Sequence, residues 1–177
     1  MATQDTAAAL QRAASVLQRR PQAGLHDDPP GIARWDGGTR VITRHANGQE
    51  VVTDLPNGLG GDSAQVTPSW LLRASLASCS ATRIAMAAAS QGIELDALEV
   101  RAGSRSDTRG LLGLAQADGT PAYPGPQDLQ LHVRIAARGV APERLRALVE
   151  QSHCLSPVLF AVQDALPLQV QVEVGES

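Results

Sequence analysis

Two cysteines carry the most reactive side chains of this 177-residue sequence. Cys79 lies inside a long Ala-rich segment, and Cys154 lies in the run His-Cys-Leu-Ser-Pro at residues 153–157. Arg83 follows Cys79 by one helical turn, and a nearby positive charge favours the thiolate form of cysteine. Cys154 stands just before a Ser-Pro pair typical of a helix start, where the backbone dipole also favours a thiolate. The sequence therefore indicates two candidate reactive thiols.

The same residues allow other interpretations. Free cysteine is among the most buried residue types, so either thiol can serve in packing alone. His153 beside Cys154 also suggests a Cys–His hydrolase, although sequence neighbours rarely point at each other. The cysteines form no CxxC or zinc pattern and the four histidines lack metal-ligand spacing, so we predict no metal site. The Gly-rich residues 58–61 lack the Lys and Ser/Thr of a phosphate loop, and we predict no cofactor.

Composition limits the classes of partner. The formal net charge is −3, all 15 basic residues are Arg, and aromatic residues make up only 2%, so we predict no nucleic-acid binding. The absence of Lys excludes Schiff-base chemistry. The first residues lack the pattern of a signal peptide, and no run approaches the roughly 18 apolar residues of a membrane span. We therefore predict a cytoplasmic protein with reduced cysteines and no membrane partner.

Cys79 is predicted to lie on a long helix. Thr67 can cap a helix, Pro68 suits the first helical position, and Gly92 suits the end, so we expect a helix from 68 to about 90. The segment is rich in Ala on nearly all sides, and a helix without a clear polar face is usually buried.

Shorter elements surround this helix in the sequence. An amphipathic helix is predicted over 6–20, and Pro142 and Pro157 each begin a further helix. Alternating apolar residues and turn signals predict strands over 32–36, 39–46, 49–55, 98–107, 111–116, 129–137 and 168–174. Strands in runs followed by helices favour an α+β fold. We divide the chain into an N-terminal helix with its linker, 1–31, and one domain, 32–177.

Several of these motifs together resemble the OsmC/Ohr family. The run Thr-Pro-Ser-Trp-Leu-Leu at 67–72, followed by Leu-Ala-Ser-Cys at 76–79, resembles the Pro-x-x-Leu-Leu…Cys helix of that family. Three further features fit the family: Leu-Glu-Val at 98–100, Arg-Gly at 109–110, and a late helix ending in Cys154 before a Ser-Pro and an alternating last strand. The resemblance covers residues 32–174.

The resemblance implies a fold, an assembly and an activity. The implied fold is α+β, with curved antiparallel sheets packed around a long central buried helix in an intertwined homodimer. The implied activity is that of a two-cysteine thiol peroxidase that reduces organic hydroperoxides without metal, flavin or haem. A small dithiol, such as a lipoyl group, is the implied reductant. The alternative is a non-catalytic OsmC-like dimer that binds a small apolar ligand.

The resemblance also implies residue roles. Cys79 matches the peroxidatic cysteine that attacks the peroxide, and Cys154 matches the cysteine that resolves the intermediate. Arg40 best matches the arginine of the first hairpin that contacts the reactive thiol, with Arg34 as the second choice.

One position departs from the active members of the family. They carry Glu just after the helix-opening Pro, and this chain has Ser69 there. The Arg–Glu–Cys network is therefore incomplete unless Glu50 or Asp62 reaches in from elsewhere. The departure places the chain closer to the broad OsmC-like branch, and the helix over 6–20 lies outside the family's core pattern.

Overall fold

The computed structural model describes residues 3–164 and 166–175. The predicted segments 1–31 and 32–177 therefore include residues outside the described ones, namely 1–2, 165 and 176–177. The helices are α1 (Thr3–Arg19), α2 (Pro68–Ser90), α3 (Thr108–Leu111), α4 (Pro142–His153) and α5 (Pro157–Gln163), with 3-10 turns η1 (Pro21–Gly24) and η2 (Asn57–Leu59). The strands are β1 (Ile32–Trp35), β2 (Val41–Arg44), β3 (Glu50–Thr53), β4 (Ala97–Arg105) and β5 (Gln127–Ala136).

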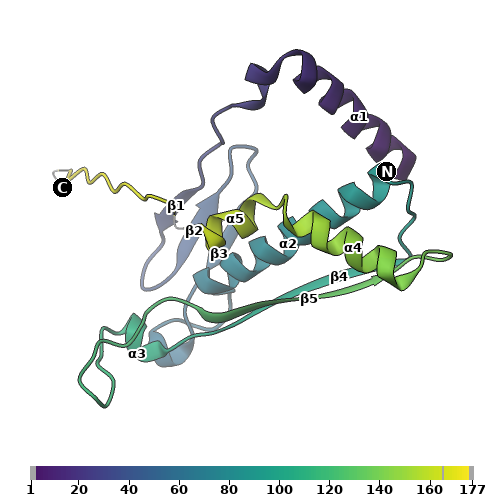
Figure 1. Cartoon of the computed structure of the whole chain (residues 1–177). Coiled ribbons are helices and arrows are strands. Elements are labelled where there is room, and N and C mark those ends of the chain that lie inside the picture. The colour runs from purple at the N-terminus through teal and green to yellow at the C-terminus, as the bar shows by residue number, and fades with distance from the viewer. Residues whose placement is uncertain (1–2, 165, 176–177) are drawn as a thin grey trace.

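The long helix α2 lies at the centre of an α+β arrangement. It packs against β4, α4, α1 and α5, which are far apart in the chain (Figure 1). The long antiparallel β4–β5 ribbon runs along α2, and the antiparallel sheet β1–β2–β3 lies toward its N-terminal end (Figure 1). The expected α+β class, antiparallel sheets and long helix are therefore confirmed. Among the described helices, none combines the length and apolar character needed to cross a membrane.

Local signals set both ends of α2 where the sequence predicts them. The hydroxyl of Thr67 accepts a hydrogen bond from the backbone N–H of Trp70 at 3.2 Å, and Pro68 takes the first helical position. Gly92 ends the helix with φ of +68°, a left-handed conformation that glycine adopts without steric cost.

Burial of α2 is confined to one stripe within a single protomer. Residues four apart are almost fully buried along it: Leu76, Ser80, Ile84 and Ala88. Ser78, Thr82 and Ala85 on the other side of the helix are exposed. The expectation of burial on nearly all sides is therefore not met by one chain alone.

The buried stripe contributes to a core shared with α4 and the β4–β5 ribbon. Ile84 and Ala88 cluster with Ile93, Leu145 and Leu148. The ribbon presents alternate residues to this cluster, because successive side chains of a strand point to opposite faces. Two partly buried pairs face each other in register at this core: Leu98 with Ile135, and Val100 with Val133. The predicted alternation of residues 129–137 is confirmed.

Two predicted strands are wrong. Residues 111–116 hold the last residue of α3 and a loop, with only an isolated bridge between Ala115 and Pro121. Residues 168–174 form no strand among the described residues and extend away from the body (Figure 1). Both segments have strand-like composition, but a strand requires a continuous hydrogen-bonded neighbour. Among the described residues, 111–116 has only this single bridge and 168–174 has no paired strand.

A buried carboxylate, Asp54, ties the β1–β3 sheet to the start of α2. Its side chain accepts hydrogen bonds from the hydroxyl of Thr39 and from the backbone N–H groups of Leu55, at 2.8 Å, and Asp62, at 3.1 Å. A Cβ at Gly61 would lie 1.8 Å from the carbonyl oxygen of Leu55, so only glycine fits this loop. These donors, led by Thr39, lower the pKa of Asp54 to about 2.

The lowered pKa of Asp54 predicts acid sensitivity. Its folded-state pKa lies below the ordinary value of 3.8, so the stability that its ionised form contributes is complete above about pH 4 and is lost as the pH falls toward 2. We expect the free energy of unfolding, measured by urea titration at fixed pH, to fall over this window. Asp54→Asn should lower the free energy of unfolding at pH 7 and should make its decrease between pH 4 and pH 2 smaller. Equal slopes in the variant and the wild type would contradict this role.

Candidate functional site

Cys79 meets a buried hydroxyl from the late part of the chain. Its sulfur lies 3.2 Å from the Oγ of Ser156, within hydrogen-bond distance for a thiol. Cys79 is partly buried on α2, and Ser156 is fully buried at the start of α5. Ser156 holds the N-cap position of α5, yet its side chain makes no capping hydrogen bond. The hydroxyl is directed to the thiol instead.

A second contact lies beside the first. The Oγ of Ser80, which is fully buried, is 2.9 Å from Nε2 of His153. Cys79 and Ser80, which are adjacent on α2, thus contact Ser156 and His153, which are three residues apart in the chain. His153 ends α4, and Ser156 directly precedes α5. Together the two contacts hold the α4–α5 junction, residues 152–157, against the middle of α2.

Cys154 lies between these two contacts. It follows the last residue of α4, its backbone N–H donates to the carbonyl of Glu150 at 3.4 Å, and its side chain is exposed. Its Cα lies within about 8 Å of that of Ser156, because two peptide units separate them. Both thiols are free. The sequence analysis expected Cys154 at the end of one helix and just before the next, and the structure places it at the C-cap of α4 ahead of α5.

The predicted arginine of the first hairpin has another partner in this protomer. Nε of Arg40 donates to Oδ2 of Asp36 at 3.0 Å, within the turn between β1 and β2. Arg34 is exposed on β1, where it lines an open hollow with Trp35 and Arg44. Among the described residues, neither Arg40 nor Arg34 forms a hydrogen bond with Cys79, so the role of Arg40 stays a prediction.

The carboxylates considered for the missing Glu are engaged elsewhere. Glu50 accepts from Nε of Arg44 at 2.6 Å, and a carboxylate oxygen of Asp62 accepts from the backbone N–H of Ala64 at 2.7 Å. Ser69 itself lies 3.1 Å, Oγ to Oγ, from the capping Thr67. Within residues 3–164 and 166–175, neither carboxylate bonds to Arg40 or Cys79.

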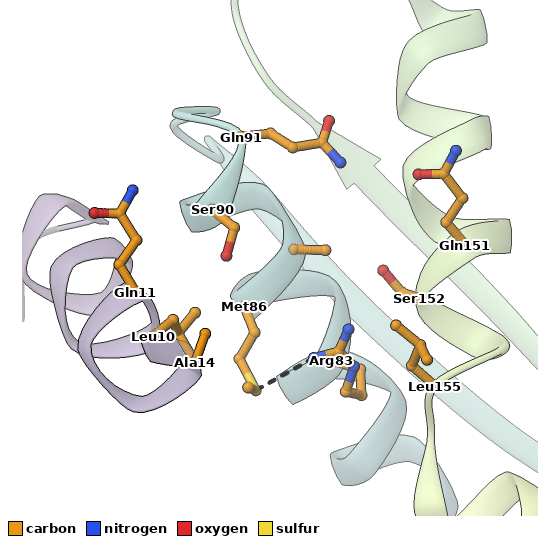
Figure 2. A pocket seen from close by; sticks show the side chains of 11 residues that line it. Leu10, Gln11, Ala14, Arg83, Met86, Ser90, Gln91, Gln151, Ser152 and Leu155 are labelled. Carbon is orange, nitrogen blue, oxygen red and sulfur yellow. Dashed lines mark hydrogen bonds between the residues drawn. The ribbon is translucent and has the colours of Figure 1, made fainter. Parts of the chain in front are cut away.

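Among the described residues, Arg83 forms no hydrogen bond with the thiol that it was expected to assist. Its Nη1 lies 3.9 Å from Sδ of Met86, toward the C-terminal end of α2, and its Nε is buried without a hydrogen-bond partner (Figure 2). The guanidinium lines an open cavity of about 400 Å³ between α1, α2 and α4. Arg83 is therefore part of this cavity and not of the contact between Cys79 and Ser156.

Sequence reasoning missed the two serines of the site. Ser80 follows the cysteine in an Ala- and Ser-rich helix, so its type carried no distinguishing signal. Ser156 was considered only as part of a helix start, because Ser before Pro is a common N-cap pattern. In the described part of the chain, no three His, Cys, Asp or Glu side chains gather in a way that suits a metal ion.

A family comparison agrees with this architecture. The family model described as OsmC-like protein matches residues 60–171, which span α2, the β4–β5 ribbon and the α4–α5 junction. The chain belongs to the OsmC-like family. No curated protein matches its sequence.

Solved structures show the same OsmC-like fold at low identity. An OsmC-like protein from Mycoplasma pneumoniae is 15% identical with a TM-score of 0.65, covering 80% of this chain and 91% of that chain. An organic hydroperoxide resistance protein from Elizabethkingia anophelis is 20% identical with a TM-score of 0.56, covering 80% and 91%. The organic hydroperoxide resistance protein OsmC from Legionella pneumophila is 21% identical with a TM-score of 0.53, covering 78% and 92%.

The contact between Cys79 and Ser156 predicts a measurable effect on thiol reactivity. A hydroxyl that donates to a thiolate favours the reactive form, so Ser156→Ala should slow alkylation of Cys79 by roughly threefold to tenfold at pH 7. The rate can be followed with iodoacetamide by mass spectrometry of the tryptic peptide at residues 74–83.

Ser152→Ala is the matched control for this OsmC-like protein. Ser152 is buried at the same junction, but its hydroxyl donates to the carbonyl of Leu148 at 2.6 Å and not to the thiol. The control should alkylate at the wild-type rate. An equal rate in Ser156→Ala would show that this hydroxyl does not support the thiolate.

Proposed function

We propose that this protein is a two-cysteine, thiol-dependent peroxidase that reduces organic hydroperoxides, with Cys79 peroxidatic and Cys154 resolving. The contact between Cys79 and Ser156 carries the proposal, because it brings a donor and the segment that holds Cys154 to the side of the reactive thiol. Family membership and the names of two structural relatives, organic hydroperoxide resistance proteins, support the same activity.

The first step consumes the peroxide. The Cys79 thiolate attacks one oxygen of ROOH, the O–O bond breaks, and the leaving alkoxide takes a proton to become ROH. The sulfur is oxidised to sulfenic acid while the peroxide is reduced. Ser156 donates a hydrogen bond to the thiolate before attack. Arg40, matched by position to the family arginine, stabilises the developing negative charge in this proposal.

The second step removes the sulfenic acid. The Cys154 thiolate attacks the Cys79 sulfur, a disulfide forms, and the hydroxyl leaves as water after protonation. A small dithiol, of lipoyl type in the family, then restores both thiols by exchange and becomes a disulfide itself. Organic hydroperoxides are the proposed substrates because their apolar part can be buried, whereas hydrogen peroxide has none.

A disulfide between the two cysteines is the decisive product. After one equivalent of cumene hydroperoxide, non-reducing tryptic mass spectrometry should join the peptide at residues 74–83 to the peptide at 147–177. With dihydrolipoamide present, the wild type should consume hydroperoxide continuously, and Cys79→Ser should abolish consumption.

Cys154→Ser separates the two roles. It should retain one turnover and hold Cys79 as a sulfenic acid that dimedone traps, because only the resolving step is lost. Ser152→Ala should keep both cysteines competent and serve as the control. If the wild type consumes no hydroperoxide with any dithiol, the peroxidase assignment fails.

We further propose that the protein works as a homodimer. Apolar residues alternate along the C-terminal segment and are strongly exposed, with exposed fractions of 87% for Leu168, 77% for Val170, 78% for Val172 and 91% for Val174. A run with the period of a strand and one apolar face gains stability by joining a sheet. The small residues on the open face of α2 also allow close approach of a second helix. A second copy of the chain is the occupant that the family resemblance implies for both surfaces.

The dimer is testable by sedimentation velocity. The wild type should sediment as a species with twice the mass of one chain. Val170→Lys should shift the population toward monomer because it puts a charge on the apolar face of the segment. Gln171→Lys, on the opposite face of the same segment, should remain dimeric. A monomeric wild type at micromolar concentration would refute the homodimer.

The second candidate is a non-catalytic dimer that binds a small ligand. The observation that favours it is Ser69 in place of the family Glu, with Glu50 and Asp62 both bonded elsewhere. In the described part of the chain, the one carboxylate bonded to Arg40 is that of Asp36 in its own turn, and no acidic group links Arg40 to the thiol. The hydroperoxide assay above distinguishes the two functions.

A further inference from the structure

An open cavity lies between the N-terminal helix α1 and the helices α2 and α4. Its volume is about 400 Å³, within the roughly 300–1,000 Å³ typical of small-molecule sites. Side chains from α1, α2 and the α4 end line it (Figure 2). Of the described residues that line it, Arg83 alone is charged. The cavity therefore has a single positive charge in neutral surroundings.

Arg83 is left without the partners that a guanidinium normally has. Its Nε is buried with no hydrogen-bond partner, and its Nη1 contacts only the weak acceptor Sδ of Met86 at 3.9 Å. None of the eight ion pairs found among the described residues includes it. Buried polar groups are almost always hydrogen-bonded, so the unpartnered Nε–H of Arg83 is a donor that a ligand can use. A planar guanidinium matches a planar oxyanion with two parallel hydrogen bonds.

The rest of the lining combines an apolar part with uncharged polar side chains. The apolar residues are Leu10, Ala14, Met86, Ala87 and Leu155, and the polar residues are Gln11, Ser90, Gln91, Gln151 and Ser152. Leu10 and Ala14 on α1 face Arg83 from one side, and Leu155 lies on the other (Figure 2). Gln91 and Gln151 lie toward one end of the opening (Figure 2). The Oε1 atom of Gln91 already accepts from Arg144 at 3.3 Å, so its amide N–H groups are the part that can serve a ligand. Such a surface suits a molecule with one anionic end and an aliphatic body.

The charge balance selects the kind of anion. A carboxylate carries one negative charge and neutralises the single guanidinium. A phosphate monoester carries close to two charges at pH 7, and no second cation lines the cavity to balance it. An uncompensated charge in a partly buried site is unfavourable. The carboxylate is therefore the better match.

We propose that this cavity binds an aliphatic monocarboxylate, with its carboxylate on Arg83 and its chain against the apolar wall shared by α1 and α2. Leu10 and Ala14 come from α1, which lies outside the range matched by the family model, so the site depends on this added helix. The proposal does not depend on the thiol chemistry, because Cys79 does not line the cavity.

Isothermal titration of octanoate into the reduced full-length protein tests the site. The wild type should bind octanoate, and Arg83→Met should weaken binding at least tenfold because the ion pair is lost. Octanol and inorganic phosphate should each bind at least tenfold more weakly than octanoate. Arg12→Gln, an exposed arginine on α1 that does not line the cavity, is the matched control and should bind like the wild type.

Two further variants keep the result decisive. Ala14→Trp fills the cavity from α1 while leaving the Arg83 side chain in the protein, and it should also abolish binding, so the test survives if Arg83→Met fails to fold. Cys79→Ser should bind octanoate normally while losing peroxidase activity, which separates this site from the proposed enzyme. No binding by the wild type, or binding by Arg83→Met within twofold of it, overturns the proposal. Equal binding of octanol or phosphate also overturns it, and so does loss of binding in Cys79→Ser.

Discussion

The pair of contacts between the middle of α2 and the α4–α5 junction is the constraint on which the rest of the site depends. Cys79 and Ser80 are consecutive on one helix, and their partners Ser156 and His153 are three residues apart. Both serines are fully buried, where each lost hydrogen bond leaves an unsatisfied polar group. The junction is therefore held by polar contacts at a fixed position beside the thiol, and Cys154 is carried with it.

These polar contacts are supported by an apolar core on the same helix. Ile84 and Ala88 continue the buried stripe of α2 and pack with Leu145 and Leu148 of α4. Because α4 cannot slide along α2 without opening this core, the residues at its C-terminal end keep their register with Cys79. At the other end, Asp54 and its donors fix the loop that leads into the helix. The position of the thiol thus follows from packing on both sides of it.

Much of the fold was predictable because it depends on local signals. The Thr-Pro start and the Gly end set the length of α2, and the alternation of residues 129–137 correctly assigned the faces of β5. The segments 111–116 and 168–174 were mispredicted because strand pairing depends on a neighbour that composition does not reveal. Sequence reasoning singled out the two cysteines as candidates and missed the serines that contact Cys79 and His153. A thiol is chemically distinctive in any sequence, whereas a serine gains a role only from what it faces.

The sequence by itself determined which groups can do chemistry and on which elements they lie: two thiols, one on a long helix and one at a helix junction, in a chain with no lysine. Only the tertiary structure decided their partners. It paired Cys79 with a hydroxyl 77 positions away and His153 with Ser80. It also placed Arg83 in the lining of a cavity formed with α1, where its polar contact among the described residues is with Met86 and not with the thiol. The physical reason is that residue type and helical spacing are local, while hydrogen bonds and cavities between elements arise only when distant segments pack.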